Sequence, residues 1–333
     1  MNHLRLFNLI LILLLAFSYY SQEEKRLALV IGNANYDKGA LKNPVNDALL
    51  MARTLDTLGF DVILDTNVET KKAFFSKIKE FGNKRPNYDV AFVYYAGHGV
   101  QINNQNYLLP TKGDFSSEDD VEQMGGISVQ LIIKYLTAMT DQVNVLILDA
   151  CRDNPFESNW DATRSLKGSG LAKMQAPSGS MIAFSTTAGN TAPDGRGENS
   201  IYCKVLAKNM LKEGVNLDQV FRNVRSEVKQ LTNGKQLTEE STQLTGNTFY
   251  LVQNTFTEEL KQIDALIEDE NYTEAIILAG HIVELSPKNK IAHYKKARVY
   301  YFLEKYESAL QSLHKAFELD SIYVSAFSLR GLI

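Results

Sequence analysis

Two kinds of apolar pattern alternate along most of the chain. Six short apolar runs indicate buried strands, at residues 27–31, 62–64, 90–95, 143–148, 181–184 and 248–252. Apolar positions at helical spacing occur at residues 47–58, 71–81, 128–139, 200–211 and 217–231, and Gly59 and Gly82 are placed to end the first two of these helices. Strands that alternate with helices form βαβ units. We therefore predict an α/β fold over residues 25–253, with a mostly parallel six-stranded sheet and helices on both faces.

After Gln253 the strand pattern stops and the sequence is helical throughout. Four pairs of positions lie 34 residues apart, which is the period of tetratricopeptide repeats: Tyr272 and Tyr306, Ala275 and Ala309, Pro287 and Ser321, Ala297 and Gly331. These positions resemble the small and aromatic sites of that repeat family. We therefore expect an all-α, tetratricopeptide-type domain over residues 257–333 with an incomplete third repeat, a generic helical tail being the alternative. Such repeats would bind a protein partner.

The N-terminus has the layout of a secretory signal peptide. Arg5 precedes the apolar run 6–17, and small or polar residues follow. The run is too short to span a bilayer, which needs about 20 residues. We predict that residues 1–21 are removed and that the protein is exported, periplasmic or secreted. An uncleaved membrane anchor is the alternative.

Composition narrows the class of protein further. The chain is 44% apolar and 22% charged with a formal net charge of −4, as in an ordinary globular protein. It has no Lys/Arg-rich block, so nucleic acid is not the expected partner. The cysteines are Cys151 and Cys203 alone, so disulfides do not hold the fold together. Cys203 lies among helically spaced apolar residues and is expected to be a small apolar residue on a helix.

The candidate chemistry lies just beyond two predicted strands. His98 follows the run 90–95 in the segment Ala-Gly-His-Gly, and Cys151 follows the run 143–148 in Asp-Ala-Cys-Arg. In an open α/β sheet the crevice beyond the carboxyl ends of the strands binds substrates, so these side chains can meet although 53 residues separate them. A thiol beside an imidazole is the minimum apparatus of a cysteine hydrolase.

Residues 26–252 resemble the caspase-like fold of clan CD cysteine peptidases, most closely the bacterial metacaspase-like members called orthocaspases. In that family a His-Gly pair follows the third strand and an acidic-x-Cys motif follows the fourth, as His98-Gly99 and Asp149-Ala150-Cys151 do here. The resemblance implies a three-layer sandwich with His98 and Cys151 as catalytic residues. It also implies that a backbone N–H near Gly99, together with that of Cys151, stabilises the oxyanion. This chemistry needs no metal or other cofactor.

The residue before Ala-Cys bears on specificity. Caspases that cleave after Asp carry Gln there, whereas this chain has Asp149. In metacaspases such an Asp, with a second in an Asn-Asp-Ala segment at the start of the first helix, forms the floor of the primary specificity pocket, and Asn46-Asp47-Ala48 matches that segment. Two carboxylates favour a cationic side chain, so the expected substrate is a peptide bond after Arg or Lys. The plainer alternatives are a helix N-terminal carboxylate for Asp47 and a helix cap for Asp149.

Two further expectations follow from the resemblance. Many metacaspases require calcium, and the acidic residues Asp114, Glu118, Asp119, Asp120 and Glu122 offer oxygen ligands, although a solvated acidic loop is the preferred interpretation. Caspase-like enzymes also commonly cut themselves between the fourth and fifth strands. The polar segment 159–177 carries Arg164, Lys167 and Lys173 as candidate cleavage sites, and an ordered loop that is never cut is the alternative.

Two rival functions remain at this level. One is a catalytically silent scaffold that binds a partner through the helical repeats. The presence of both His98 and Cys151 argues against this function. The other is a legumain- or gingipain-like clan CD peptidase. The Asn-Asp-Ala and Asp-Ala-Cys-Arg segments favour the metacaspase-like group.

Overall fold

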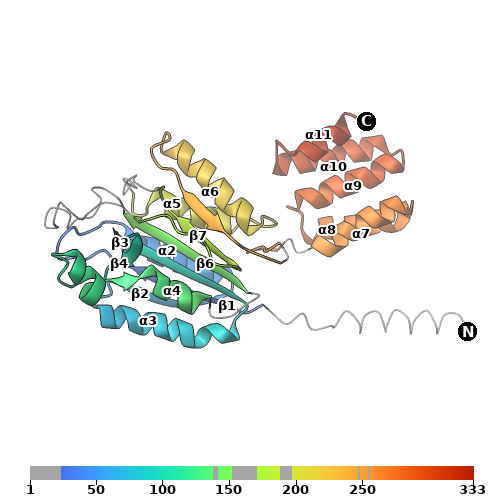
Figure 1. Cartoon of the computed structure of the whole chain (residues 1–333). Helices are drawn as coiled ribbons and strands as arrows, with labels where there is room; N and C mark the ends of the chain where they lie inside the picture. The colour runs from blue at the N-terminus through green and yellow to red at the C-terminus, as the bar shows by residue number, and fades with distance from the viewer. Residues whose placement is uncertain (1–23, 138–141, 152–170, 188–196, 247, 254–255) are drawn as a thin grey trace, which may run out of the picture. The chain divides into compact units, whose positions relative to one another are not determined.

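The computed structural model describes residues 24–137, 142–151, 171–187, 197–246, 248–253 and 256–333. The chain divides into two compact units, residues 1–252 and 253–333. The first holds a sheet and the second consists of helices (Figure 1).

The sheet of the first unit has the strand order β2-β1-β3-β6-β7-β8 along its main path. The strands are β1 (Arg26–Gly32), β2 (Phe60–Thr66), β3 (Val90–Ile102), β6 (Val143–Cys151), β7 (Ser180–Phe184) and β8 (Glu239–Thr242). All neighbours on this path are parallel except β7 and β8. The expected α/β fold with mostly parallel strands is therefore confirmed.

Two short strands extend the sheet beside the end of β3. β1 pairs with β3 only as far as Ala96, and β4 (Gln105–Leu108) then pairs antiparallel with β3 from Gly99 onward. β5 (Ile127–Ser128) pairs with β4. With these additions the described sheet has eight strands, so the expected number of six is not confirmed.

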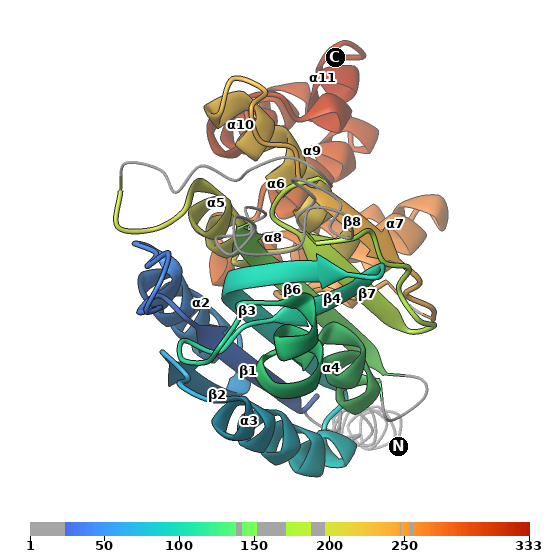
Figure 2. The same cartoon turned by 60° about the vertical axis from the view of Figure 1, so that its left-hand side comes forward.

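Helices cover both faces of the sheet (Figure 1, Figure 2). One face packs against α2 (Pro44–Thr57), α5 (Ile201–Met210) and α6 (Leu217–Leu231), and the other against α3 (Lys71–Lys84) and α4 (Val129–Leu136). Side chains of β3 alternate between the two cores: Phe92 and Tyr94 face α2 and α5, whereas Val93 and Tyr95 face α3 and α4. A strand buried on both faces is apolar at every position, and this is why residues 90–95 form a continuous run.

The segment 248–252 is not a strand, which corrects one sequence-based prediction. Leu251 is buried, but the backbone here bonds to a side chain and to the segment that leads into α6, with one isolated bridge between Asn216 and Tyr250 instead of a paired strand. Arg26 Nη1 donates to the Leu251 carbonyl, and the amides of Gly214 and Leu217 donate to the carbonyls of Val252 and Phe249. The last strand on the path is β8, whose residues are polar.

Gly82 does not end the second helix, because α3 continues to Lys84. A Cβ at Gly82 would lie 2.1 Å from Cδ1 of Tyr135 on α4. The glycine therefore permits close contact between α3 and α4 rather than ending a helix. Gly59, with φ +78°, does follow α2 in the left-handed conformation, as expected.

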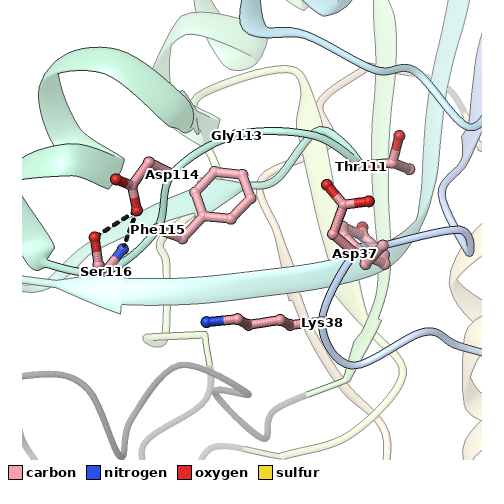
Figure 3. A pocket seen from close by; sticks show the side chains of 8 residues that line it. Asp37, Lys38, Thr111, Gly113, Asp114, Phe115 and Ser116 are labelled. Carbon is pink, nitrogen blue, oxygen red and sulfur yellow. Dashed lines mark hydrogen bonds between the residues drawn. The ribbon is translucent and has the colours of Figure 1, made fainter.

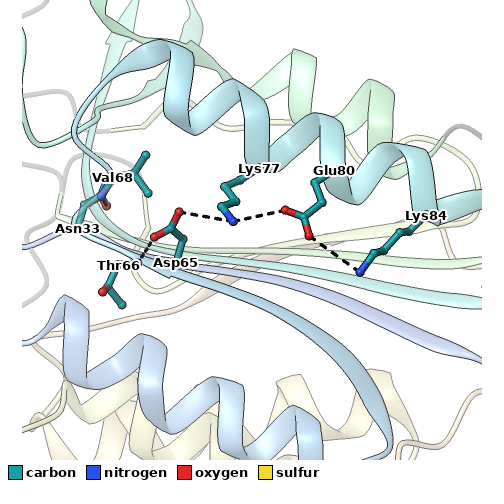
Figure 4. A network of polar contacts seen from close by, with 7 residues as sticks. All are labelled: Asn33, Asp65, Thr66, Val68, Lys77, Glu80 and Lys84. Carbon is teal, nitrogen blue, oxygen red and sulfur yellow. Dashed lines mark hydrogen bonds and ion pairs between the residues drawn. The ribbon is translucent and has the colours of Figure 1, made fainter.

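A charged network runs from β2 along α3, through Asp65, Lys77, Glu80 and Lys84 (Figure 4). The N–O separations are 4.0, 3.4 and 3.9 Å, and these side chains are 33 to 50% exposed. Exposed pairs of this kind contribute about 0–1 kcal/mol each. The docking of α3 therefore depends mainly on the buried side chains of Phe74, Ile78 and Phe81.

The second unit contains α7 (Thr257–Glu268), α8 (Tyr272–Leu285), α9 (Lys290–Phe302), α10 (Tyr306–Leu319) and α11 (Val324–Arg330). Helices α8 and α10 begin 34 residues apart, and so do α9 and α11. Ala275 and Ala309, one on each of α8 and α10, are fully buried. The helical C-terminal region predicted from the sequence is thus present.

Two short helical segments complete the first unit, Arg85–Asn87 and Asp120–Gly125. Among all described helices of the chain, none combines the length and the apolar character that crossing a bilayer requires.

Candidate active site

His98 and Cys151 are register partners on adjacent parallel strands. β3 and β6 pair from Val90 with Val143 as far as His98 with Cys151, so the two backbones lie side by side at the carboxyl end of the sheet. Neighbouring strands are about 4.8 Å apart. The pairing places the backbone of Cys151, and its side chain lies outside the described part of the chain.

Gly97 leaves room for two tyrosine hydroxyls that bond to the backbone of His98. Its φ is +153°, and a Cβ there would lie 2.6 Å from the Tyr95 hydroxyl and 2.7 Å from the Tyr36 hydroxyl. Both phenols bond to the next residue: the His98 N–H donates to Tyr36 Oη at 2.9 Å, and Tyr95 Oη donates to the His98 carbonyl at 2.7 Å. Only glycine leaves room for both hydroxyls at this point.

The imidazole of His98 is oriented by a backbone carbonyl. Nε2 lies 2.6 Å from the Gly39 oxygen, and the ring packs against that of Tyr36 at 4.4 Å between centroids. Because a carbonyl can only accept, Nε2 carries the proton, and the lone pair of the neutral ring is at Nδ1. His98 is only 4% exposed. Nδ1 is therefore the nitrogen that can act as a base.

Two asparagines hold the loop that carries Tyr36 and Gly39. Asn33 is fully buried; its Nδ2 donates to the Leu109 carbonyl at 3.0 Å, and its Oδ1 accepts from the Val68 amide at 2.9 Å. Figure 4 shows Asn33 beside Val68. Asn67 Oδ1 accepts from the amides of Ala34 and Asn35, at 2.9 and 3.0 Å. These bonds tie the first residues of the loop, 33–35, to the ends of β2 and β4.

Asp47 and Asp149 lie together on the α2 and α5 face of the sheet, joined by Ser200. Asp47 Oδ1 accepts from the Ser200 amide and from Asn199 Nδ2, both at 2.9 Å. Asp149 Oδ2 accepts from the Ser200 hydroxyl at 3.1 Å and from the Tyr94 hydroxyl at 3.0 Å. The structure therefore brings two of the predicted site residues together beside the end of β6.

The environment disfavours ionisation of Asp47. Burial raises the pKa of its carboxyl from 3.8 to about 7, the negative charge of Asp149 adds to the shift, and the bonds from Asn199 and Ser200 oppose it. Asp47 is 2% exposed, whereas Asp149 is half-buried. A cation between these carboxylates would relieve their repulsion, so the pair is suited to binding a positively charged group.

Gly99 lies in the antiparallel ladder opposite Leu108. The Leu109 amide donates to the His98 carbonyl at 3.1 Å, so Gly99 and Leu108 form a non-hydrogen-bonded pair and the Gly99 N–H points away from β4. A Cβ on Gly99 would lie 2.8 Å from Leu171 and 3.3 Å from Ala150, next to Cys151. The Gly99 backbone is thus closely packed on the side of β6.

Cys203 is a fully buried residue of α5, as the sequence indicated. Its Sγ donates to the Asp47 carbonyl at 3.4 Å. Burial and the two carboxylates raise the pKa of this thiol well above its usual range, so it stays protonated. Cys203 packs under the acidic pair and is a poor nucleophile.

The other predicted site residues are only partly described. Arg164 and Lys167 lie outside the described residues. Lys173 is exposed and pairs with Glu239 at 2.7 Å. The preceding residue, Ala172, is held by both side-chain atoms of Asn106, at 2.8 and 2.6 Å.

The acidic stretch 114–122 binds its own neighbours. Asp114 accepts from Ser116, and Asp120 accepts from Ser117 Oγ at 2.6 Å. Within the ranges that the structure describes, no group of three or more His, Cys, Asp or Glu side chains is arranged to hold a metal ion. The stretch itself does not present the donor set of a calcium site, so calcium dependence stays a prediction.

Sequence reasoning missed the residues that support this site. Ser200, Asn199, Tyr36 and the Gly39 carbonyl carry no motif of their own, and Tyr94 is one aromatic residue in an apolar run. Ser200 offered a weak signal, because it precedes a helix, and the structure makes it the N-cap of α5. Its bonds to Asp47 and Asp149 span 153 and 51 residues of sequence and have no local signature.

The sheet and the helices on its two faces form three layers, and a histidine and a cysteine lie at adjacent strand ends, as expected of a cysteine hydrolase. Residues 25–249 match the family model of the caspase domain. The chain therefore belongs to the caspase-domain family and is a cysteine-type peptidase, with a protein or peptide as its substrate. A search of curated proteins found no match.

Proposed function

We propose that this protein is a metacaspase-like cysteine endopeptidase that hydrolyses peptide bonds after Arg or Lys. The observation that carries the proposal is the Asp47–Ser200–Asp149 cluster at the end of the strand that also delivers Cys151. A planar guanidinium can bond two carboxylates at once, so Arg is preferred over Lys.

The catalytic step uses Cys151 and His98. His98 Nδ1 takes the thiol proton, and the Cys151 sulfur attacks the scissile carbonyl carbon to form a tetrahedral oxyanion. The Gly99 and Cys151 N–H groups would stabilise that oxyanion, as the resemblance to caspase-like peptidases implies. The protonated Nδ1 then gives its proton to the leaving amine, and water hydrolyses the thioester to release the acid and free Cys151. The Gly39 carbonyl keeps Nε2 protonated throughout.

The C-terminal unit supports a second part of the proposal. Helices that begin at a spacing of 34 residues, with buried alanines at equivalent positions, are typical of tetratricopeptide repeats. We assign this unit to partner binding. The sequence layout of residues 1–21 supports export of the mature enzyme.

A panel of fluorogenic peptides that differ only in the residue before the scissile bond tests the specificity. We expect kcat/KM to be highest for the Arg peptide and lower for the Lys peptide. For the Asp peptide it should be lower than for the Arg peptide by a factor of about 100 or more, because burying an unpaired third carboxylate beside Asp47 and Asp149 is strongly unfavourable. Faster cleavage of the Asp peptide than of the Arg peptide would overturn the assignment of this pocket. Absence of all cleavage would favour the silent scaffold, and cleavage after Asn a legumain-like enzyme.

Self-processing is expected between β6 and β7, after Arg164 or Lys167. Lys173 is the poorest of the three candidates, because a substrate segment must be extended and free, whereas Asn106 holds Ala172 by two hydrogen bonds. Intact mass of the wild type and of Cys151→Ala, measured after incubation, checks this. New termini after Arg164 or Lys167 in the wild type alone support the prediction. A wild type that is active and stays full-length contradicts it, and a new terminus after Lys173 contradicts the ranking.

A further inference from the structure

A cavity of about 320 Å³ lies next to His98, between the loop that follows β1 and the loop that follows β4. Tyr36, Asp37 and Lys38 line it from the first loop, and Thr111, Asp114 and Phe115 from the second. Figure 3 shows Asp37 and Lys38 facing Asp114 and Phe115 across this space. The catalytic chemistry proposed above uses none of the charged groups in this cavity.

The cavity and the imidazole share one wall. Tyr36 lines the cavity, packs against the His98 ring at 4.4 Å, and accepts the His98 N–H. Asp37 and Lys38 lie between Tyr36 and Gly39, whose carbonyl holds Nε2. The segment that orients the base therefore also forms one side of the cavity.

The cavity lies on the opposite side of His98 from Cys151. At the end of β3, Cys151 is on the β6 side, paired with His98. The Thr111 loop is on the β1 side, where the Thr111 amide donates to the Val68 carbonyl just after β2. Asp149 is on β6 itself, two residues before Cys151, and Asp47 meets it from the first turn of α2 through Ser200. Asp149 and Cys151 on β6, His98 on β3 and the cavity beyond β3 thus follow one another across the strand ends.

This order matches the direction of a bound peptide. The Arg before the scissile bond lies at the acidic pair, and His98 protonates the amine that leaves, so the peptide beyond that bond runs out on the side of His98. An extended peptide advances about 3.3 Å per residue, so its second or third residue after the bond passes the His98 and Tyr36 rings. We propose that this cavity binds the side chain of one of these leaving-group residues, an inference that rests on the proposed function.

The lining selects side chains that donate hydrogen bonds. The Lys112 ammonium engages Oδ1 of Asp37, and the Ser116 amide and hydroxyl engage Oδ1 of Asp114. Among the described residues nothing bonds to Oδ2 of either carboxylate, so both oxygens can accept from a ligand. The bonds from Ser116 lower the pKa of Asp114, which is ionised at neutral pH. The charged groups that line the cavity are these two carboxylates and the single ammonium of Lys38, whose charge also lowers the pKa of Asp114. Because the carboxylates outnumber the ammonium, Lys, Arg, Gln or Asn is favoured in this subsite, and Asp or Glu disfavoured.

Two kinds of substrate separate this subsite from the catalytic site. A peptidyl-arginyl aminomethylcoumarin amide has no residue after the scissile bond. Internally quenched peptides with the same residues up to Arg carry Lys, Gln or Glu at the second and third positions after it. The wild type is expected to cleave the Lys and Gln peptides about fivefold faster than the Glu peptide in kcat/KM, as one or two modest charge-assisted bonds predict.

The double variant Asp37→Asn/Asp114→Asn is expected to lower cleavage of the Lys peptide about fivefold relative to cleavage of the coumarin amide by the same variant. Asp56→Asn, an exposed carboxylate at the far end of α2, should keep the wild-type ratio and is the matched control. Equal loss on both substrates would overturn the inference, since the cavity would then only support His98. Equal cleavage of the Lys and Glu peptides by the wild type would also overturn it. If the wild type does not cleave the coumarin amide, the proposed function itself fails, and the inference with it.

Discussion

Replacing either Cys151 or His98 with Ala is expected to lower kcat for arginyl-peptide hydrolysis by about 10⁴- to 10⁶-fold. Loss of the sulfur removes the nucleophile, and loss of the imidazole removes both the base that activates it and the acid that protonates the leaving amine. Because the two residues act as one unit, the double variant should be little worse than either single variant. Initial rates with a peptidyl-arginyl coumarin amide measure all three effects.

Cys203→Ala is the matched control for the loss of a thiol. It removes a buried Sγ from beneath Asp47, so it costs some stability, but the Asp47 carboxylate keeps its bonds to Ser200 and Asn199. Activity should stay within about threefold of the wild type, because a buried protonated thiol takes no part in the reaction. If Cys203→Ala abolishes activity and Cys151→Ala does not, the assignment of the nucleophile is wrong.

Asp149→Asn should lower kcat/KM for arginyl substrates by about 30- to 1,000-fold, the loss expected when one partner of a buried ionic contact is removed. The fold should persist, because an amide oxygen can still accept from Tyr94 and Ser200. Circular dichroism and thermal unfolding check that point. Retention of wild-type kcat/KM by Asp149→Asn would contradict the role of the acidic pair.

Asp47 adds a pH dependence to the same site. In the free enzyme its pKa is raised to about 7, so below that pH the carboxyl is protonated and the pair attracts a guanidinium less strongly. kcat/KM for arginyl peptides should therefore rise as the pH increases through about 7. Asp47→Asn should remove this rise and keep the pH dependence that comes from ionisation of His98 and Cys151. Profiles of the two proteins on one substrate separate the contributions. Superimposable profiles would show that Asp47 does not titrate in this range.

Ionisation of Asp47 also makes the stability of the folded protein depend on pH. Folding raises the pKa of Asp47 above its usual value of 3.8, so the folded state binds this proton more tightly than the unfolded state does. The contribution of Asp47 to the free energy of unfolding therefore decreases as the pH rises from about 4 to about 7. The melting temperature of Asp47→Asn should be less sensitive to pH over this interval than that of the wild type.

The sequence by itself determined the layers of the fold and the places of the two reactive residues. Continuous apolar runs predicted parallel strands because a strand buried on both faces has no polar position, as β3 shows with Phe92 and Val93 in separate cores. His98 and Cys151 follow such runs directly, and parallel strands end at one edge of a sheet. Their pairing in register follows from the sheet that these runs form. Residues 248–252 have the apolar pattern of a strand, but they do not pair with a neighbouring strand, so the strand prediction was wrong there.

Only the tertiary structure decided how the site is held together. Ser200 meets Asp47 and Asp149, the Gly39 carbonyl meets Nε2 of His98, and Tyr135 fills the space beside Gly82. Each of these contacts joins residues distant in the sequence, and none changes the local apolar period or the local turn signals. Hydrophobic pattern reports which face of an element is buried, because burial acts on every residue of that face. The choice of a hydrogen-bond partner or of a packing neighbour depends on which segments the fold brings within about 3 Å, and this is decided only when the layers assemble.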